Sequence, residues 1–240
     1  MTTLARLTIG VLLALLGASC QMDLNWGTGV RGNGTVIRES RSITEDFTVI
    51  SAAEGMDVFV TQGENTDIVV EADENIQELI GTDIRNGELH IHAIENIGRA
   101  TRKIYVTVPE VTGLHASSGA DLVIRGVLEV DRIRVDASSG ADIHAELSAD
   151  EVSASCSSGA DIHLSGRTNL LYATASSGSD IKARDLEATV CEANVSSGAD
   201  IEVFVSKSLK AHSSSGGDIR YGGEPRVELN NSASGSVRKF

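Results

Sequence analysis

The chain has 240 residues, enough for one large or two small domains, and carries a net charge of −14 at pH 7. Residues 1–20 contain Arg6 as their single charged side chain, so the remaining chain has a net charge of −15. Binding to nucleic acids is dominated by Lys and Arg contacts to phosphates, and the sequence has neither a basic stripe nor a group of aromatic residues suited to base stacking. The composition therefore excludes nucleic acid as the expected partner.

Residues 1–19 have the features of an export signal, because Arg6 precedes an apolar run that is too short to span a bilayer permanently. The small residues before Cys20 resemble a bacterial lipobox, although Leu16 stands four residues before the cysteine instead of three. We predict that residues 20–33 comprise a lipidated Cys20 and a tether. The predicted location is the cell envelope, as an outer-membrane lipoprotein facing the periplasm or the surface. Ordinary signal cleavage with a free Cys20 thiol is the alternative.

Residues 34–110 are predicted to form an irregular, β-rich N-terminal part of the folded domain. Apolar and alternating runs predict four strands, at residues 35–39, 47–51, 68–72 and 104–108. Residues 73–80 are typical of a helical turn, and Asn86-Gly87 between two apolar residues predicts a hairpin. The stretch around Gly55 matches the later repeats in residue type, so we place the first repeat there, 64 residues before the next copy at Gly119.

Residues 111–240 contain a repeat of about nineteen residues centred on the sequence Ser-Ser-Gly-Ala-Asp. Its glycine recurs at positions 119, 140, 159, 178, 198, 216 and 235. Inward apolar residues such as Val135 and Ala137 alternate with Arg134 and Asp136, and the alternation resumes after the turn. This period of two predicts a strand, a tight turn with a positive φ at glycine, a second strand and a looser return. Stacking such coils gives an all-β fold, a right-handed parallel β-helix (β-solenoid).

One aspartate per coil is expected to form a ladder along the turns. The six residues are Asp121, Asp142, Asp161, Asp180, Asp200 and Asp218. Like charges about 4.8 Å apart repel by roughly 1 kcal/mol in water, so the ladder needs compensation. The favoured interpretation is structural, with each carboxylate accepting hydrogen bonds from its own turn. A ladder that binds calcium is the alternative, although the chain lacks the nine-residue Gly-Gly-x-Gly-x-Asp repeat of known calcium solenoids.

The remaining residues with reactive side chains are expected to have structural roles. His144 and His163 share an outward register and could hold a transition metal together, but no third ligand continues their row. Cys156 and Cys191 are predicted to be buried apolar groups too far apart for a disulfide. The equivalent repeated serines do not suit a nucleophile with one base and one oxyanion hole. We therefore expect no catalytic residue, no metal site and no cofactor, with a glycosidase-type pair of outward carboxylates left open.

The sequence resembles a known family. The resemblance depends on three stretches, residues 34–36, 47–50 and 56–63, followed by the glycine-centred turns, and it covers roughly residues 34–236. This pattern is similar to the DUF2807 family, described as an autotransporter-adhesin head, the GIN domain. The resemblance implies a pectin-lyase-like β-helical fold, no retained catalytic residues and a role in cell adhesion.

Taken together, these features favour a non-enzymatic, envelope-anchored interaction module that serves cell-surface adhesion. Its expected partners are the membrane, through the lipid, and an unknown glycan or surface protein, with self-association through exposed strand edges as a further expectation. The alternatives are a polysaccharide-active enzyme on a pectin-lyase-like β-helix and a purely structural envelope protein. Coil lengths that vary by only a residue or two argue against the cleft that an enzyme needs, whereas weak multivalent binding along a rod suits adhesion.

Overall fold

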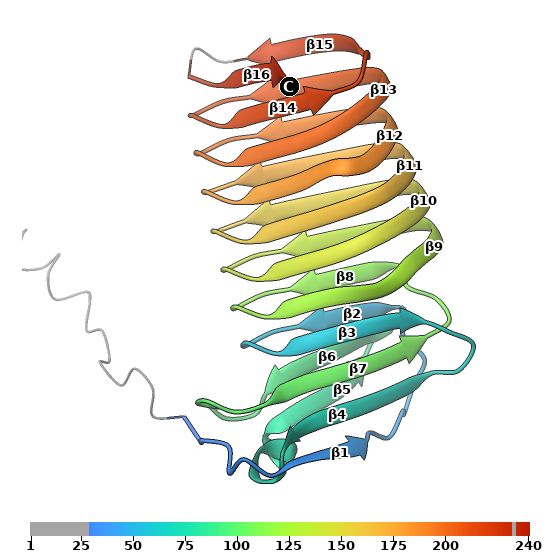
Figure 1. The fold of residues 1–240 in the computed structure, drawn as a ribbon, viewed down its shortest axis with the longest axis vertical. Coiled ribbons are helices and arrows are strands. Elements are labelled where there is room, and N and C mark those ends of the chain that lie inside the picture. Colours follow the sequence, from blue (N-terminus) through green and yellow to red (C-terminus); the bar gives the residue numbers. More distant parts are fainter. Residues whose placement is uncertain (1–28, 232–233) are drawn as a thin grey trace, which may run out of the picture.

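A computed structural model of the protein describes residues 29–231 and 234–240. Its strands form a single 16-stranded sheet that winds into a β-solenoid, as predicted (Figure 1). The predicted export signal and Cys20 lie outside the described residues. Across the described ranges, no helix has both the length and the apolar character that crossing a membrane requires.

Five long strands form the regular coils. They are β9 (Asp121–Ala137), β10 (Asp142–Ser157), β11 (Asp161–Ser176), β12 (Asp180–Val195) and β13 (Asp200–Ser213). Neighbouring strands pair in parallel, and β10 and β11 align residue by residue from one tight turn to the next. The return that was predicted to be loose is therefore a bend within a continuous strand, so that coil-to-coil hydrogen bonds follow the chain around the bend.

The C-terminal end of the stack is partly open in the described residues. Its last coil consists of β14 (Asp218–Gly222), β15 (Arg226–Asn231) and β16 (Ser236–Lys239), which pair with β13 and β14. Leu229 has the same inward register as the fully buried Ala211, yet 54% of its surface is exposed. The described residues thus leave the core of the last coil partly uncovered.

The N-terminal end is built out of sequence order. β2 (Val49–Ala52) and β3 (Asp57–Gln62) form the first coil and pair with β8 (Gly113–Ala116) and β9. The intervening segment turns back, so that β6 (Glu88–Ala93) and β7 (Arg102–Val108) lie on the other side of β2 and β3 (Figure 1). The 3₁₀ helix η1 (Glu74–Leu79) and the antiparallel strands β1 (Val36–Ser40), β4 (Asp67–Asp73) and β5 (Ile80–Arg85) complete this end. The predicted strands, helical turn and hairpin are confirmed, with small shifts of their boundaries.

Small aliphatic side chains fill the interior and let the two walls of each coil lie close together. One column consists of Ala154, Ala173, Ala193 and Ala211, each at most 2% exposed. Cys156 and Cys191 are also buried, and both are free thiols. Burial raises the pKa of Cys156 to about 11 and that of Cys191 to about 12, so both thiols stay protonated and pack as apolar groups, as expected.

The tight turns are type I′ β-turns, in which two consecutive residues have positive φ angles. In one of them Ser139 has a φ of 54° and Gly140 a φ of 70°, and the Ala141 N–H donates to the Ser138 carbonyl oxygen at 3.3 Å. The Gly140 N–H also donates to the Ser158 carbonyl oxygen of the next coil at 3.2 Å. The positive φ of the glycine was predicted, whereas that of the serine was not. Backbone hydrogen bonds between coils therefore run through the turns as well as the strands.

Candidate binding groove beside the turns

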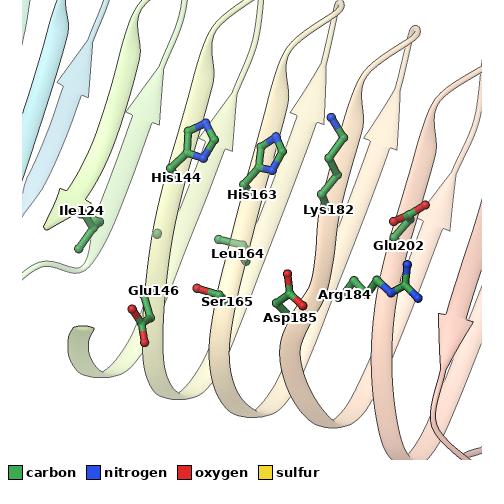
Figure 2. Close-up of a pocket in the computed structure, with 11 residues that line it drawn as sticks. Ile124, His144, Glu146, His163, Leu164, Ser165, Lys182, Arg184, Asp185 and Glu202 are labelled. Carbon is green, nitrogen blue, oxygen red and sulfur yellow. The ribbon is translucent and has the colours of Figure 1, made fainter. Parts of the chain in front are cut away.

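Two adjoining hollows lie on the outer face of the arm that follows each tight turn. One, of about 380 Å³, crosses β9 to β13 and is shown in Figure 2. The other, of about 460 Å³, lies across β3, β9 and β10 and includes Phe59 and Asp121 in its lining. His144 lines both hollows, so together they form one shallow channel along the stacking direction, which we call the groove.

A central row of outward side chains forms the middle of the groove, one from each coil. The row consists of Phe59, Val123, His144, His163, Lys182 and Glu202. The rings of His144 and His163 stack with their centroids 4.4 Å apart and 14° between their planes. Their shared outward register is therefore confirmed. Because the ring faces lie against each other (Figure 2), further hydrogen bonds of the two imidazoles can form only at the ring edges, which carry the nitrogen atoms.

Two coils that are longer than nineteen residues add charged side chains in or beside the groove. β9 has two extra residues opposite Ala145, and β12 has one extra residue opposite Leu164. Such β-bulges redirect side chains. In β9 the Arg125 guanidinium lies over the Phe59 ring, 4.4 Å from its centroid, and in β12 two adjacent charged residues are both exposed, namely Arg184 and Asp185. The irregular coils therefore shape a shallow, open hollow, which differs from the deep cleft that the coil lengths argued against.

Aromatic rings close the N-terminal end of the groove. Phe59 and Tyr105 stack with their centroids 5.3 Å apart and 20° between their planes. Arg125 lies over both rings, and Arg38 lies 5.3 Å from the centroid of Tyr105. Because these partners cover the ring faces, the cluster stabilises this end of the groove and leaves little aromatic face for a ligand to stack on.

The six predicted ladder aspartates line up in register along the turn side of the groove, which places them beside the central row. The turn N–H groups, however, donate to backbone carbonyl oxygens of adjacent coils, as the Asp142 N–H does to Ala120 at 3.0 Å. In residues 29–231 and 234–240, the expected capping of turn N–H groups by these carboxylates does not occur. Nor do these residues contain a group of three or more His, Cys, Asp or Glu placed to hold a metal ion.

Charge repulsion along the ladder is only partly compensated. Burial, followed by the charges of neighbouring ladder residues, raises the pKa of Asp121 and of Asp200. Lys182 offsets the repulsion in the middle of the ladder, because its Nζ lies 3.5 Å from Asp161 and 3.7 Å from Asp180. Burial first, and then the positive charges nearby, lower the pKa of His163.

These shifts predict that removing one ladder charge stabilises the protein at neutral pH. A raised carboxyl pKa contributes stability that is complete below the ordinary value of 3.8 and is lost as the pH rises through the folded-state pKa. The lowered pKa of His163 has the opposite effect on stability. Its contribution to the free energy of unfolding is complete above pH 6.5 and is lost as the pH falls through the folded-state pKa. We expect Asp121→Asn to raise the free energy of unfolding at pH 7 by about 0.5 kcal/mol, and to lose this advantage below about pH 4.

Thermal unfolding followed by circular dichroism between pH 3 and 8 measures this effect. Asp131→Asn is the matched control, because Asp131 is exposed and lies outside the ladder. The change in stability caused by Asp131→Asn should show no comparable dependence on pH. If Asp121→Asn instead lowered stability at pH 7, the repulsion inferred for the ladder would be absent.

The face on the other arm of the coils contains an ion network that sequence analysis did not find. The His115 imidazole lies between two carboxylates, with Nδ1 3.3 Å from Glu88 and Nε2 3.3 Å from Asp136. Arg134 also contacts Asp136, at 2.5 Å. These groups come from β6, β8 and β9, so only the out-of-order pairing at the N-terminal end brings them together. These side chains are largely occupied by one another.

A further hollow of about 990 Å³ lies at the outer bends, opposite the tight turns. The Gln62 side chain links separate chain segments there. It donates hydrogen bonds to the carbonyl oxygens of Pro109 (3.1 Å) and Glu129 (3.0 Å) and accepts one from the Glu129 N–H (2.9 Å). These bonds hold the crossover before β8 to the bend of β9. We therefore interpret this hollow as a consequence of the way the chain crosses over at this end of the stack.

Comparisons with solved structures support the same fold. A "putative adhesin" from Bacteroides fragilis is 21% identical, with a TM-score of 0.80, and the match covers 88% of this chain and 100% of that one. A "putative adhesin" from Parabacteroides merdae (20% identity, TM-score 0.72) and a "putative lipid binding protein" from Parabacteroides distasonis (22%, 0.71) match over 88% of this chain and 99% of theirs. At these identities the likeness shows the fold alone.

A comparison with curated proteins gave no match. A family model described as "Putative auto-transporter adhesin, head GIN domain" matches residues 46–225, which include the first coil, all five regular coils and both hollows of the groove. Its description points to the cell surface or envelope. The match covers most of the chain, and the protein therefore belongs to the DUF2807 family, as its sequence resemblance predicted.

Proposed function

We propose that this protein is a non-enzymatic adhesion module of the bacterial envelope, anchored by a lipid on Cys20 and binding its target through the groove. The groove itself carries the proposal, because it presents an open row of polar side chains on rigid, stacked coils. The family's description as an adhesin head supports the same assignment.

The coils provide a preorganised binding surface. Each groove residue projects from a strand whose backbone is hydrogen-bonded to the coils on both sides, so little chain entropy is lost when a ligand binds. A shallow site of this kind makes few contacts per molecule, and useful strength comes from many copies acting together on one cell. Anchoring at Cys20 would display the copies at the membrane surface.

The groove carboxylates suit binding better than catalysis. Glu146 and Asp185 are outward acidic residues in the same register, two coils apart with Ser165 between them, and both are exposed. A glycosidase needs one carboxyl group held protonated near neutral pH, which requires an environment that excludes water. An open groove with exposed carboxylates lacks that environment, and this favours adhesion over polysaccharide cleavage.

The test is attachment of bacteria that display the full chain to surfaces coated with polysaccharides, mucin or matrix proteins. We expect cells with the protein to attach in larger numbers than cells without it, and Cys20→Ala to abolish the gain by releasing the protein from the membrane. Polysaccharide turnover that disappears in Glu146→Gln would overturn the non-enzymatic assignment. Unchanged attachment on every surface would overturn adhesion and favour a structural role in the envelope.

A further inference from the structure

We infer that the groove binds a linear, uncharged polysaccharide that lies along the stack of coils. This ligand class rests on the proposed function, since it names what the same groove would hold. Three features of the groove lead to it: its repeat distance, its mixture of hydrogen-bond donors and acceptors, and its charge.

The repeat distance of the groove matches a sugar chain better than a peptide. The groove crosses six neighbouring strands, from β3 through β9 to β13, which makes it about 24 Å long at about 4.8 Å per strand. An extended β-linked sugar advances by roughly 5 Å per unit, the length of a pyranose ring and its bridging oxygen with bonds of about 1.5 Å. An extended peptide presents side chains to one face about every 6.6 Å and falls out of phase with the coils. Each coil therefore faces one sugar.

The polar groups of the groove match the chemistry of hydroxyl groups. In the 380 Å³ hollow, His144, His163 and Lys182 supply N–H groups. The next outward positions along the strands include Glu146 and Asp185, which supply carboxylate oxygens (Figure 2). A hydroxyl group both donates and accepts, so neighbouring hydroxyls on one sugar can satisfy a donor and an acceptor at the same time. A row of donors beside a row that contains acceptors suits a polyhydroxylated chain.

The charge of the groove disfavours ionised polysaccharides. Its lining contains two basic residues, Lys182 and Arg184, against six carboxylates: Asp57, Asp121, Asp142, Glu146, Asp185 and Glu202. An anionic polysaccharide would be repelled by this excess and by the net charge of −14. A chain with an amine on every sugar would be attracted by the carboxylates, but it would also bring positive charges against Lys182 and Arg184 in the middle of the groove. An uncharged chain avoids both penalties.

Binding at one groove should be weak but preorganised. The faces of Phe59 and Tyr105 are covered by each other and by Arg125, which leaves hydrogen bonds as the main source of affinity. Lys182 is already positioned by Asp161 and Asp180 before a ligand arrives. We expect a dissociation constant of about 1 mM for one groove, and affinity should rise with oligosaccharide length until the groove is filled.

The experiment is a calorimetric titration of the full chain, purified in a mild detergent, with β-1,4-linked gluco-oligosaccharides of increasing length. We expect measurable binding, and a tenfold or greater loss in the double variant His144→Ala, His163→Ala. His212→Ala is the matched control, because His212 is an exposed strand histidine on the opposite face, and it should bind as the unmodified protein does. Glu146→Gln, at an exposed position, gives a second test that does not depend on the stacked rings. Circular dichroism shows whether each variant is folded.

Parallel titrations with a glucosamine oligomer, an oligogalacturonate and a lysine-rich peptide distinguish the other ligand classes. Tighter binding of any of these would overturn the inference, as would gluco-oligosaccharide binding that both groove variants leave unchanged. If cells attach to coated surfaces but no neutral oligosaccharide binds, the ligand class is wrong and the adhesion proposal stands. If neutral oligosaccharides bind through the groove but cells never attach, the ligand class is upheld and adhesion is wrong.

Discussion

Gly166→Ala is expected to lower the free energy of unfolding by about 3 kcal/mol or more. Gly166 lies in the bend of β11 with a φ of 104°, and a Cβ at this position would stand 2.1 Å from the Leu147 carbonyl oxygen of β10. Real Cβ atoms essentially never come closer than 3.0 Å to another heavy atom, so the backbone of one coil has to move. That movement disrupts the ladder of parallel hydrogen bonds between β10 and β11, which joins the coils on its two sides.

Gly159→Ala is the matched control for this prediction. Gly159 lies at a turn tip with a φ of 70°, but a Cβ there would have open space around it. This variant should lose only about 1 kcal/mol, the strain of a positive φ on an alanine. Urea denaturation of both variants measures the difference. Equal losses would mean that backbone strain, and not the close approach of two coils at Gly166, determines the cost.

Asp73→Ala should have an effect of similar size, at the N-terminal end of the stack. The Asp73 carboxylate is buried and accepts hydrogen bonds from the N–H groups of Gly34 (2.6 Å) and Thr101 (2.7 Å). It therefore ties the segments that precede β1 and β7 to the end of β4. Its removal leaves two backbone donors without their partner, which we expect to cost about 2–4 kcal/mol.

The hydrogen bond from the Thr101 N–H is the main cause that lowers the pKa of Asp73. A lowered carboxyl pKa contributes stability that is present above pH 3.8 and is lost as the pH falls through the folded-state value. The gap in melting temperature between Asp73→Ala and the unmodified protein should thus narrow in strong acid. Asp67→Ala, at an exposed position in the same strand, should change little at any pH. A gap that stayed constant with pH would show that packing, and not the carboxylate, stabilises this end.

The regular part of the fold was predictable because every coil repeats the same tight turn and the same alternation of inward and outward residues. A tight turn requires a residue that adopts a positive φ, and Gly140 and its equivalents mark that position at every coil. Alternation of inward and outward residues then fixes which side of each strand is buried. The positive φ of Ser139 was missed because serine rarely adopts it, and only the geometry of a type I′ turn imposes it.

The groove was much harder to predict, because it depends on departures from the repeat. Aligning the repeats emphasises what the coils share, whereas Arg125, Arg184 and Asp185 take their positions from extra residues in single coils. The stacked pair of His144 and His163 could be predicted from the shared register, but the hollow around it could not. The bridge from His115 to Glu88 was hidden for another reason, since β6 and β8 become neighbours of β2 only through tertiary pairing.

The residue-by-residue alignment of β10 with β11 has an evolutionary consequence. Asp142 faces Asp161 and Ser157 faces Ser176, so a gene that lost or duplicated one such repeat would encode a chain in which every remaining coil still meets a suitable neighbour. The length of the stack can then change in whole steps of about 4.8 Å without redesign of the core. The N-terminal end, where the strands interlock out of order, offers no such freedom. Lineages that carry this fold should therefore vary in the number of their coils and retain the N-terminal end.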